Sequence, residues 1–515
     1  MCKAIIRPGF LKRDFLFKFV VALLLHSFQP AAGQPGNKGS VAGRLPNIIY
    51  IYADDLGYGE LGCYGQQKIK TPHIDKMASE GIRFTQHYTG APVCAPARCM
   101  LMTGKHSGHS FIRGNHELGG FADSAERGQL PLPDAAFTVA ELLKQKGYAT
   151  ALMGKWGLGM HTTEGSPGRQ GFDYYYAYLD QKQAHNFYPT HLWENDRWDS
   201  LHQPFINVHK KLDSTKATAA DFDYFKGNTY SQGLFTQKAL WFIEKNKEKP
   251  FFLYLPFTLP HVSLQVPDEY VMKYAGQFNE RPYYGQNGYA SSLHPLSAYA
   301  GMITYLDDQV GLIMQKLKES GLDENTIVMF SSDNGATFAG GVNAGFFNSS
   351  AGLRGLKMDL YEGGIRVPFI ARWPGKIRAN LATDHLSAQY DFLATVADIT
   401  GQEIPDTDGI SFLPVLLGQK QKPHKYLYFE YPEKNGQIAI RMGRWKGVKT
   451  ELKKNAANSW QLYDLQNDEQ ETTDIASKHR EILKKFDKIV EKEHKEPSIK
   501  SWQFVAGVIK ESGGK

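Results

Sequence analysis

The sequence predicts an α/β fold with a large, mostly parallel (mixed) sheet sandwiched by helices, followed by a smaller C-terminal α+β domain. Apolar, β-branched runs of strand length recur through most of the chain, and helical patterns separate them. Beyond about residue 418 the runs become shorter and lie at hairpin spacing. Strands that alternate with helices indicate a parallel sheet covered on both faces, whereas closely spaced short strands indicate an antiparallel sheet.

The strands of the large sheet are predicted from near-continuous apolar runs, which are typical of strands buried on both faces. The first run is PNIIYIYADD (46–55). The others are YATALMG (148–154), FFLYLPF (251–257), TIVMFSS (326–332) and VPFIARW (367–373). Helices are predicted at HIDKMASEG (73–81), FTVAELLKQKG (137–147) and SAYAGMITYLDDQVGLIMQKLKESG (297–321).

The C-terminal part is predicted to be a short antiparallel sheet with one terminal helix. Its strands are YLYFEYP (426–432), GQIAIRMG (436–443) and RWKGVKT (444–450), and its amphipathic helix is HREILKKFDKIVEKEH (479–494). The whole chain is therefore expected to have four parts. They are a signal peptide (1–33), a linker (34–45), a catalytic domain (46–418) and a C-terminal antiparallel-sheet subdomain (419–515).

The N-terminus has the pattern of an export signal. A basic stretch from Lys3 to Arg13 precedes the apolar run FLFKFVVALLLHSF, and small residues follow up to Gly33. The apolar run is too short for a permanent span, so we expect no stable membrane anchor. Cleavage near Gly33 would remove Cys2 and leave three cysteines, an odd number that excludes a fold held together by several disulfides.

The charge pattern excludes a nucleic-acid-binding role. The chain has 59 Lys and Arg residues against 53 Asp and Glu residues, and no basic stripe interleaved with aromatic residues. Aromatic residues make up 13% of the chain, which suits both a large core and a sugar-binding cleft.

Oxygen-bearing side chains follow two of the predicted strands. Asp54 and Asp55 end the first strand, and Asp333 and Asn334 end the fourth. In an open parallel sheet, ligands bind beyond the carboxyl ends of the strands. Four such side chains at one edge suit a hard divalent cation such as Ca²⁺ or Mg²⁺, although Asp and Asn also commonly begin loops.

Cys94 lies at the start of the helical pattern PARCMLMTG (96–104), with Pro96 near the first turn, where proline is favoured. The N-terminus of a helix attracts anions, and Arg98 adds a forked cation for oxyanions. A nucleophile at such a helix end and near a metal describes a phosphoryl- or sulfuryl-transfer site. A disulfide with Cys63 or Cys99, or a plain buried thiol, explains the same residues equally well.

Three basic residues adjoin the predicted strands. Lys155 directly follows one strand, His261 follows the FFLYLPF segment, and Lys357 precedes the last strand. A single Lys or His at a strand end is usually solvated. Their recurrence at several strands indicates a site suited to an anionic ester.

The chain resembles the formylglycine-dependent sulfatases, the type I sulfatases of the alkaline phosphatase superfamily, over nearly all of its mature length. CAPARCMLMTGK (94–105) matches the family pattern Cys-x-Pro-(Ser or Ala)-Arg followed by a Leu/Met-Thr-Gly run. Four further segments fall in the expected order. They are PNIIYIYADDLGYGELGCYG (46–65), GYATALMGKWGLG (147–159), SSDNG (331–335) and LRGLKMDLYEGGIRVPFIARWPG (353–375).

The resemblance implies that Cys94 is a precursor. A formylglycine-generating or anaerobic maturation enzyme would oxidise it to formylglycine (3-oxoalanine). One hydroxyl of the hydrated aldehyde would attack sulfur and displace the alcohol, and the other would then expel sulfate from the covalent ester.

The resemblance also implies roles for the other residues. One Ca²⁺ ion would be bound by Asp54, Asp55, Asp333, Asn334 and residue 94. The cations that neutralise the sulfate would be Arg98, Lys155 and Lys357. His261 and Lys357 would act on the leaving-group oxygen.

The sequence departs from the family pattern at two positions. Ala97 stands where Ser is commonest, which bears on the maturation system that accepts the site. Gly157 stands two residues after Lys155, where many members have a histidine that serves as base for the elimination. His161 and His185 are the candidates to replace it, and surface or sugar contact is their alternative role.

These features predict an exported sulfuric ester hydrolase that acts on sulfated carbohydrates, such as polysaccharides or glycosaminoglycan-like oligosaccharides. Segments 109–120 and 181–199, expected to be loops, carry side chains suited to sugars. The single Asn-x-Ser/Thr sequence, at Asn348, favours a bacterial periplasmic or secreted enzyme. The alternatives are a phosphodiester or phosphonate monoester hydrolase of the same superfamily, and a catalytically silent sulfated-glycan-binding protein.

Overall fold

Strand β1 (Asn47–Ala53) lies inside the large sheet and is buried on both faces. Its side chains alternate between two cores, with Ile49 and Ile51 in one and Ile48 and Tyr50 in the other. This burial on both faces is the reason for its continuous apolar sequence. The structure, a computed structural model, describes residues 44–118, 126, 128–403 and 405–513. The predicted signal peptide (1–33) and the linker up to residue 43 lie outside the described residues.

Among the described residues the large sheet has ten strands. In spatial order they are β11 (Leu381–Thr383), β2 (Ile82–Phe84), β10 (Phe369–Arg372), β9 (Thr326–Ser332), β1, β8 (Phe251–Pro256), β4 (Ala149–Lys155), β5 (Tyr174–Tyr178), β6 (His191–Glu194) and β7 (Arg197–Ser200). The five strands from β9 to β5 are parallel, whereas β10, β6 and β7 pair antiparallel with their neighbours. The predicted mostly parallel, mixed sheet is confirmed. A separate pair is formed by β3 (His87–Tyr88) and β12 (Ser387–Ala388).

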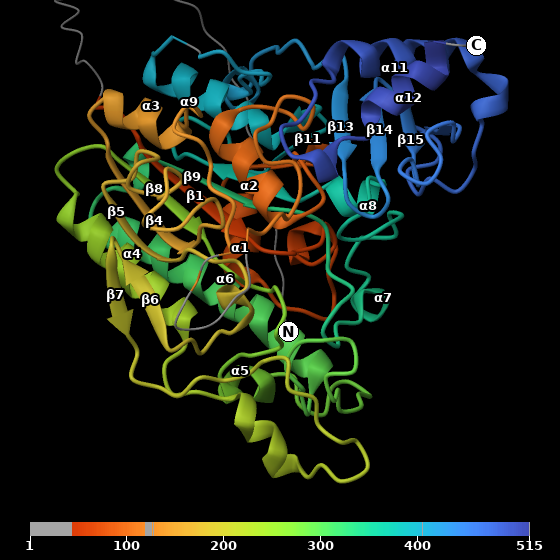
Figure 1. The fold of residues 1–515 in the computed structure, drawn as a ribbon. Coiled ribbons are helices and arrows are strands. Elements are labelled where there is room, and N and C mark those ends of the chain that lie inside the picture. Colours follow the sequence, from red (N-terminus) through yellow and green to blue (C-terminus); the bar gives the residue numbers. More distant parts are fainter. Residues whose placement is uncertain (1–43, 119–125, 127, 404, 514–515) are drawn as a thin grey trace, which may run out of the picture. The chain divides into compact units, whose positions relative to one another are not determined.

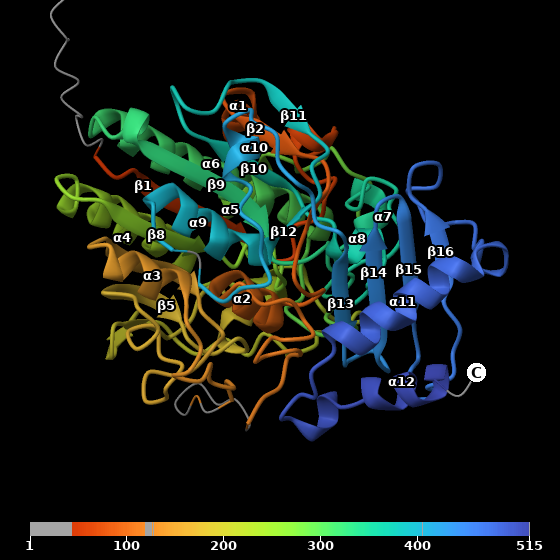
Figure 2. The same cartoon turned by 90° about the horizontal axis from the view of Figure 1, so that it is seen from above.

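Helices cover both faces of the sheet (Figure 2). One core contains side chains of α1 (Pro72–Ser79), α4 (Ser231–Lys245) and α6 (Pro295–Glu319). The other core contains side chains of α2 (Cys94–Thr103), α3 (Val139–Gln145) and α9 (Phe392–Thr400). Shorter helices are α5 (Asp268–Met272), α7 (Ala344–Phe347), α8 (Glu362–Ile365) and α10 (Leu413–Leu416). No helix in the described part of the chain is long and apolar enough to cross a membrane.

The expectation that residues 181–199 form a loop is wrong for their second half. This half forms the hairpin β6–β7 at the edge of the sheet, with Glu194 opposite Arg197. The two-residue turn has Asn195 at φ 52°, a left-handed conformation that Asn tolerates better than most residues. The Asn-Asp pair was therefore a hairpin signal, but each face of these short strands mixes apolar and polar residues, so no alternating pattern accompanies it.

The C-terminal part has a four-stranded antiparallel sheet of β13 (Leu427–Tyr431), β14 (Gln437–Met442), β15 (Trp445–Lys449) and β16 (Gln461–Asp464). One face packs on α11 (Arg480–Glu493) through residues such as Ile440 and Phe486. The other face packs toward α8, with Phe429, Ala439 and Ile365 in one core (Figure 1). A second terminal helix, α12 (Val505–Gly513), was not expected. Residues Arg44–Lys515 form one compact unit.

Gln437, at the start of β14, fixes the loop that carries Lys357. Its Nε2 donates to the Met358 carbonyl at 2.8 Å, and its Oε1 accepts from the Leu360 amide at 3.2 Å. Met358 has φ 72°, which a non-glycine residue adopts only where its surroundings hold it. The Gln437 side chain is buried, so these two bonds are shielded from water.

We predict that Gln437→Leu lowers the free energy of unfolding by about 1–3 kcal/mol, because it leaves a buried carbonyl and a buried amide unpaired. Urea denaturation followed by circular dichroism measures the change. Gln466→Leu is the control, since Gln466 is exposed, and it should stay within about 0.5 kcal/mol of the wild type. Equal stability of the two variants would show that the Gln437 bonds contribute nothing.

Candidate active site

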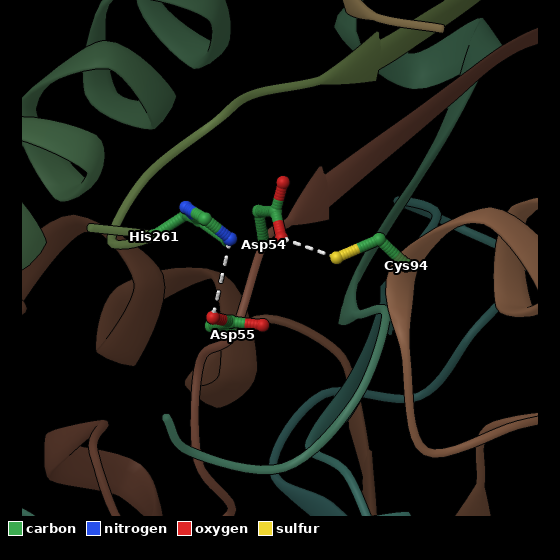
Figure 3. Close-up of side chains that lie close together, drawn as sticks. All are labelled: Asp54, Asp55, Cys94 and His261. Carbon is green, nitrogen blue, oxygen red and sulfur yellow. Dashed lines mark hydrogen bonds and ion pairs between the residues drawn. The ribbon is translucent and has the colours of Figure 1, made fainter. Parts of the chain in front are cut away.

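The carboxyl ends of four strands bring polar side chains to one edge of the sheet. Asp54 and Asp55 follow β1, and Asp333 follows β9. Because Ala53 lies opposite Ser332 in these parallel strands, the two aspartate segments leave the sheet side by side. Lys155 is the last residue of β4, and His261 lies shortly after β8 (Figure 3).

The Asp54 carboxylate is bound by two buried cations. It accepts from Lys155 Nζ at 2.7 Å and lies 3.1 Å from Arg98 NH2. Arg98 NH2 also donates to Asp333 Oδ2 at 2.9 Å, and Arg98 NH1 donates to the Lys155 carbonyl at 2.9 Å. Burial alone would raise the pKa of Asp54, but the cations Lys155 and Arg98 hold it well below its usual value.

The Asp55 carboxylate lies in a second group of contacts. Lys357 Nζ lies 2.8 Å from Asp55 Oδ1, and Asn334 Nδ2 donates to the same oxygen at 2.8 Å. The Asp55 backbone is left-handed, at φ 65°, and its amide donates to Asp333 Oδ1 at 3.0 Å. Burial raises the pKa of Asp333 to about 7, and the neighbouring Asp54 adds to this effect. The hydrogen bond from the Asp55 amide to Asp333 thus joins the segment after β1 to the segment after β9.

Cys94 is the first residue of α2, and its thiol faces the aspartates. Its Sγ lies 3.3 Å from Asp54 Oδ1 and 3.6 Å from Lys357 Nζ. The expected alternative of a disulfide is wrong, because Cys63, Cys94 and Cys99 are all free. Cys99 packs in the core that contains α2, α3 and α9, and its sulfur accepts a hydrogen bond from the Ser110 hydroxyl.

The Cys94 thiol is held in its neutral form. Burial raises its pKa, and the Asp54 carboxylate raises it further, whereas Lys155 and Lys357 only partly offset this. Reactive cysteines instead have a lowered pKa, because the thiolate is the nucleophile. The unmodified thiol is therefore poorly suited to attack an ester.

The residues present fit a divalent cation. Asn334 Oδ1 is buried and has no hydrogen-bond partner among the described residues. Ligand atoms of Asp54, Asp55, Cys94 and His261 lie within 4.8 Å of one another. Asp333 adjoins this group through the Asp55 amide but is not one of the four. Carboxylate and amide oxygens are the ligands that Ca²⁺ prefers, and an unused buried acceptor beside them needs such a partner.

His261 and His185 form a parallel pair next to Asp55. The ring centroids are 5.2 Å apart with an interplanar angle of 7°, and His261 Nε2 lies 3.7 Å from Asp55 Oδ2. His261 Nδ1 donates to the Val262 carbonyl, which leaves Nε2 as the basic nitrogen of the neutral ring. Burial lowers the pKa of both histidines well below the usual value.

The two histidines proposed to replace Gly157 are placed differently. His185 belongs to the site through His261, whereas His161 stacks on Trp193 at 4.0 Å. Gly157 itself has φ 74°, and an added Cβ would lie 3.0 Å from Gln181 Cγ. The Gln181 side chain therefore fills the space next to this glycine.

Several residues near the site were not singled out from the sequence. Tyr289 contacts the rings of both His185 and His261, at 5.1 and 5.9 Å. Asn115 Oδ1 accepts from the Ala95 amide in the first turn of α2, at 3.2 Å. Tyr289 lies in a loop with φ 64°, for which the sequence carries no motif. Asn115 follows the Cys94 motif closely, and this proximity is the one signal that could have identified it.

The sequence and the fold match known sulfatases. The Sulfatase family matches residues 46–402, and a family described as N-sulphoglucosamine sulphohydrolase, C-terminal, matches residues 356–496. The N-acetylgalactosamine-6-O-sulfatase of Bacteroides thetaiotaomicron is 30% identical, over 87% of this chain and 92% of its own length. Human arylsulfatase A is 33% identical, over 79% of this chain and 75% of its own.

A solved structure shares the fold. The crystal structure of Ps i-CgsB in complex with k-i-k-neocarrahexaose is 27% identical and covers 92% of this chain and 98% of its own, with a TM-score of 0.73. The family match spans well over half of the chain, and the bacterial relative aligns with most of it. The chain belongs to the sulfatase family, the type I sulfatases of the alkaline phosphatase superfamily, and is a sulfuric ester hydrolase.

Proposed function

We propose that this sulfatase hydrolyses sulfate esters of carbohydrates through a formylglycine formed from Cys94. The observation that carries the proposal is the position of Cys94 at the helix N-terminus, 3.6 Å from Lys357 Nζ and buried with its thiol neutral. A thiol there is a poor nucleophile, whereas a hydrated aldehyde in the same place supplies two hydroxyls for attack and release.

The chain's own cations would bind and stabilise the sulfate group. Arg98, Lys155 and Lys357 come from three segments and approach the aspartates from different directions. Such fixed charges in a buried site stabilise the charge that develops on the ester oxygens without reorganising water. Neutral His261, with Nε2 toward the site, is suited to act on the leaving-group oxygen together with Lys357.

The cation would be a single Ca²⁺ held by Asp54, Asp55, Asp333 and Asn334, with residue 94 completing its ligands. When bound, it would supply Lewis-acid polarisation of the sulfate oxygens. The support is the buried Asn334 Oδ1 and the aspartates beside it.

His185 is our candidate for the base that the family pattern would place at Gly157. It lies against His261, and burial lowers its pKa, which keeps the ring neutral and able to accept a proton. Its Nδ1 is buried without a hydrogen-bond partner in the described part of the chain, as is that of His161. His161, however, stacks on Trp193 and contacts none of the site residues among those that the structure describes.

Sulfated carbohydrate is favoured as substrate by the names of two of the similar proteins. The Bacteroides relative is an N-acetylgalactosamine-6-O-sulfatase, and the solved structure described above is a complex with k-i-k-neocarrahexaose. We propose further that the enzyme is exported, periplasmic or secreted, and is matured by a formylglycine-generating or anaerobic enzyme. The proposed division is a catalytic domain over 46–418 and a C-terminal subdomain over 419–515.

We predict that protein that releases sulfate carries formylglycine in place of Cys94. In active protein, the tryptic peptide 84–98 should be about 18 Da lighter than its unmodified cysteine form. The same protein should release sulfate from at least one of N-acetylgalactosamine 6-sulfate, N-acetylglucosamine 6-sulfate and galactose 4-sulfate. Mass spectrometry and ion chromatography measure the two quantities.

Phosphodiester and phosphonate analogues serve as the comparison in the same assay, and Cys94→Ala is the inactive control. Faster turnover of the phosphorus esters would favour the alternative hydrolase. Full activity with unmodified Cys94 would refute the formylglycine mechanism. Binding of sulfated sugars without release would indicate a catalytically silent binding protein.

We predict that Ca²⁺ stabilises the protein by about 2.7 kcal/mol at one hundred times its Kd, and that Asn334→Ala abolishes most of this gain. Thermal unfolding with and without Ca²⁺ after chelation measures the effect apart from activity. Asn287→Ala, at an exposed asparagine, should keep the wild-type response. An unchanged shift in Asn334→Ala would remove Asn334 from the ligand set.

We predict that His185→Asn lowers kcat by about a hundredfold or more, as expected for loss of a general base, while His161→Asn stays near the wild type. The fold should survive, because Ser263 bonds the backbone carbonyl of His185 and not its ring. Steady-state kinetics on the best sulfated sugar decides between the two histidines. Similar losses in both variants would argue against a specific role for His185.

A further inference from the structure

Four aromatic side chains form a continuous wall that leads away from Asp55. His261 is the first ring and His185 the second, stacked at 5.2 Å. His209 is the third, with its centroid 6.0 Å from that of His185. Tyr289 contacts all three rings, at 5.9, 5.1 and 5.6 Å. A molecule that extends from the reaction centre along this wall therefore reaches His209.

His209 also lines a cavity of about 390 Å³. This volume lies in the usual range of small-molecule sites. The side chains that line it with His209 include Lys182, Gln183, Pro189, Phe205 and Asn207. The cavity thus adjoins the wall of rings at His209, whose ring contacts that of His185.

The lining offers a flat apolar surface. Phe205, which lines the cavity, is 52% exposed. Gln183 is buried, and its Nε2 donates to the His191 carbonyl at 3.0 Å. Its Oε1 has no hydrogen-bond partner within the described ranges. This oxygen is itself enclosed, so the part of the lining that a ligand can contact is the Phe205 ring, which suits a ligand with an apolar face.

We propose that this cavity binds the sugar unit next to the sulfated one, so that the enzyme acts best on oligosaccharides. The inference rests on the proposed function, because it takes the sulfated unit to lie at Cys94. A pyranose ring has a face of C–H groups that packs on an aromatic ring such as Phe205. Lys182, the cation at the rim, is already paired with Glu117, which favours a neutral sugar over an anion.

The test compares two substrates in wild-type and variant enzymes. They are the best sulfated monosaccharide of the panel above and the trisaccharide that carries the same residue at its non-reducing end. We expect Phe205→Ala to lower kcat/KM for the trisaccharide by about tenfold and to leave the monosaccharide within about twofold.

Trp241→Ala is the matched control, since Trp241 is also an exposed ring, 44% exposed, but packs on Tyr174 on another part of the surface. It should leave both substrates unaffected. Equal kcat/KM for the two substrates in the wild type, or equal losses in Phe205→Ala, would overturn the proposal.

Binding of the unsulfated trisaccharide, measured by calorimetry, distinguishes a failure of the proposed function from a failure of the proposed subsite. If it binds and Phe205→Ala weakens binding, while no sulfated sugar is hydrolysed, the subsite stands and the proposed function fails. If sulfate is released but the unsulfated trisaccharide does not bind, the proposed function stands and the subsite is refuted.

Discussion

The arrangement of the site depends on the ion pairs that the buried Asp54 carboxylate forms. A carboxylate removed from water needs opposite charges with good geometry, and breaking such a pair is costly. Asp54 obtains them from Lys155 at the end of β4 and Arg98 in α2. Because Arg98 also bonds Asp333, the ends of β1, β4 and β9 and the first turns of α2 can take only one relative position.

The same constraint explains why the C-terminal sheet belongs to the catalytic unit. Lys357 is the third cation, and its backbone amide bonds the Ala336 carbonyl beyond β9. The next residue, Met358, bonds Pro92 just before α2 and accepts from Gln437 of β14. The position of Lys357 is thus set by three separate parts of the chain. A C-terminal sheet that did not dock would leave this cation free to move.

The sequence predicted the fold class and the central strands, because burial on both faces leaves an uninterrupted apolar run. It also predicted the residues that follow strand ends, since parallel pairing brings them to one edge. It could not predict the edge hairpin β6–β7, whose strands have only four residues each. Tyr289 and Gln437 were missed for another reason. Their positions result from long-range packing of a loop and a distant sheet, which no local pattern records.

The balance of charge among the site residues favours the binding of a divalent cation together with an anion. Asp54, Asp55 and Asp333 oppose Arg98, Lys155 and Lys357, so with all six ionised the chain's own groups nearly cancel. Burial, together with the neighbouring Asp54, nevertheless raises the pKa of Asp333, so this carboxylate is less well compensated than Asp54. A divalent cation would supply further positive charge and leave an excess for a bound anion. In the proposed mechanism residue 94 would contact both, since Cys94 Sγ lies 3.3 Å from Asp54 Oδ1 and 3.6 Å from Lys357 Nζ.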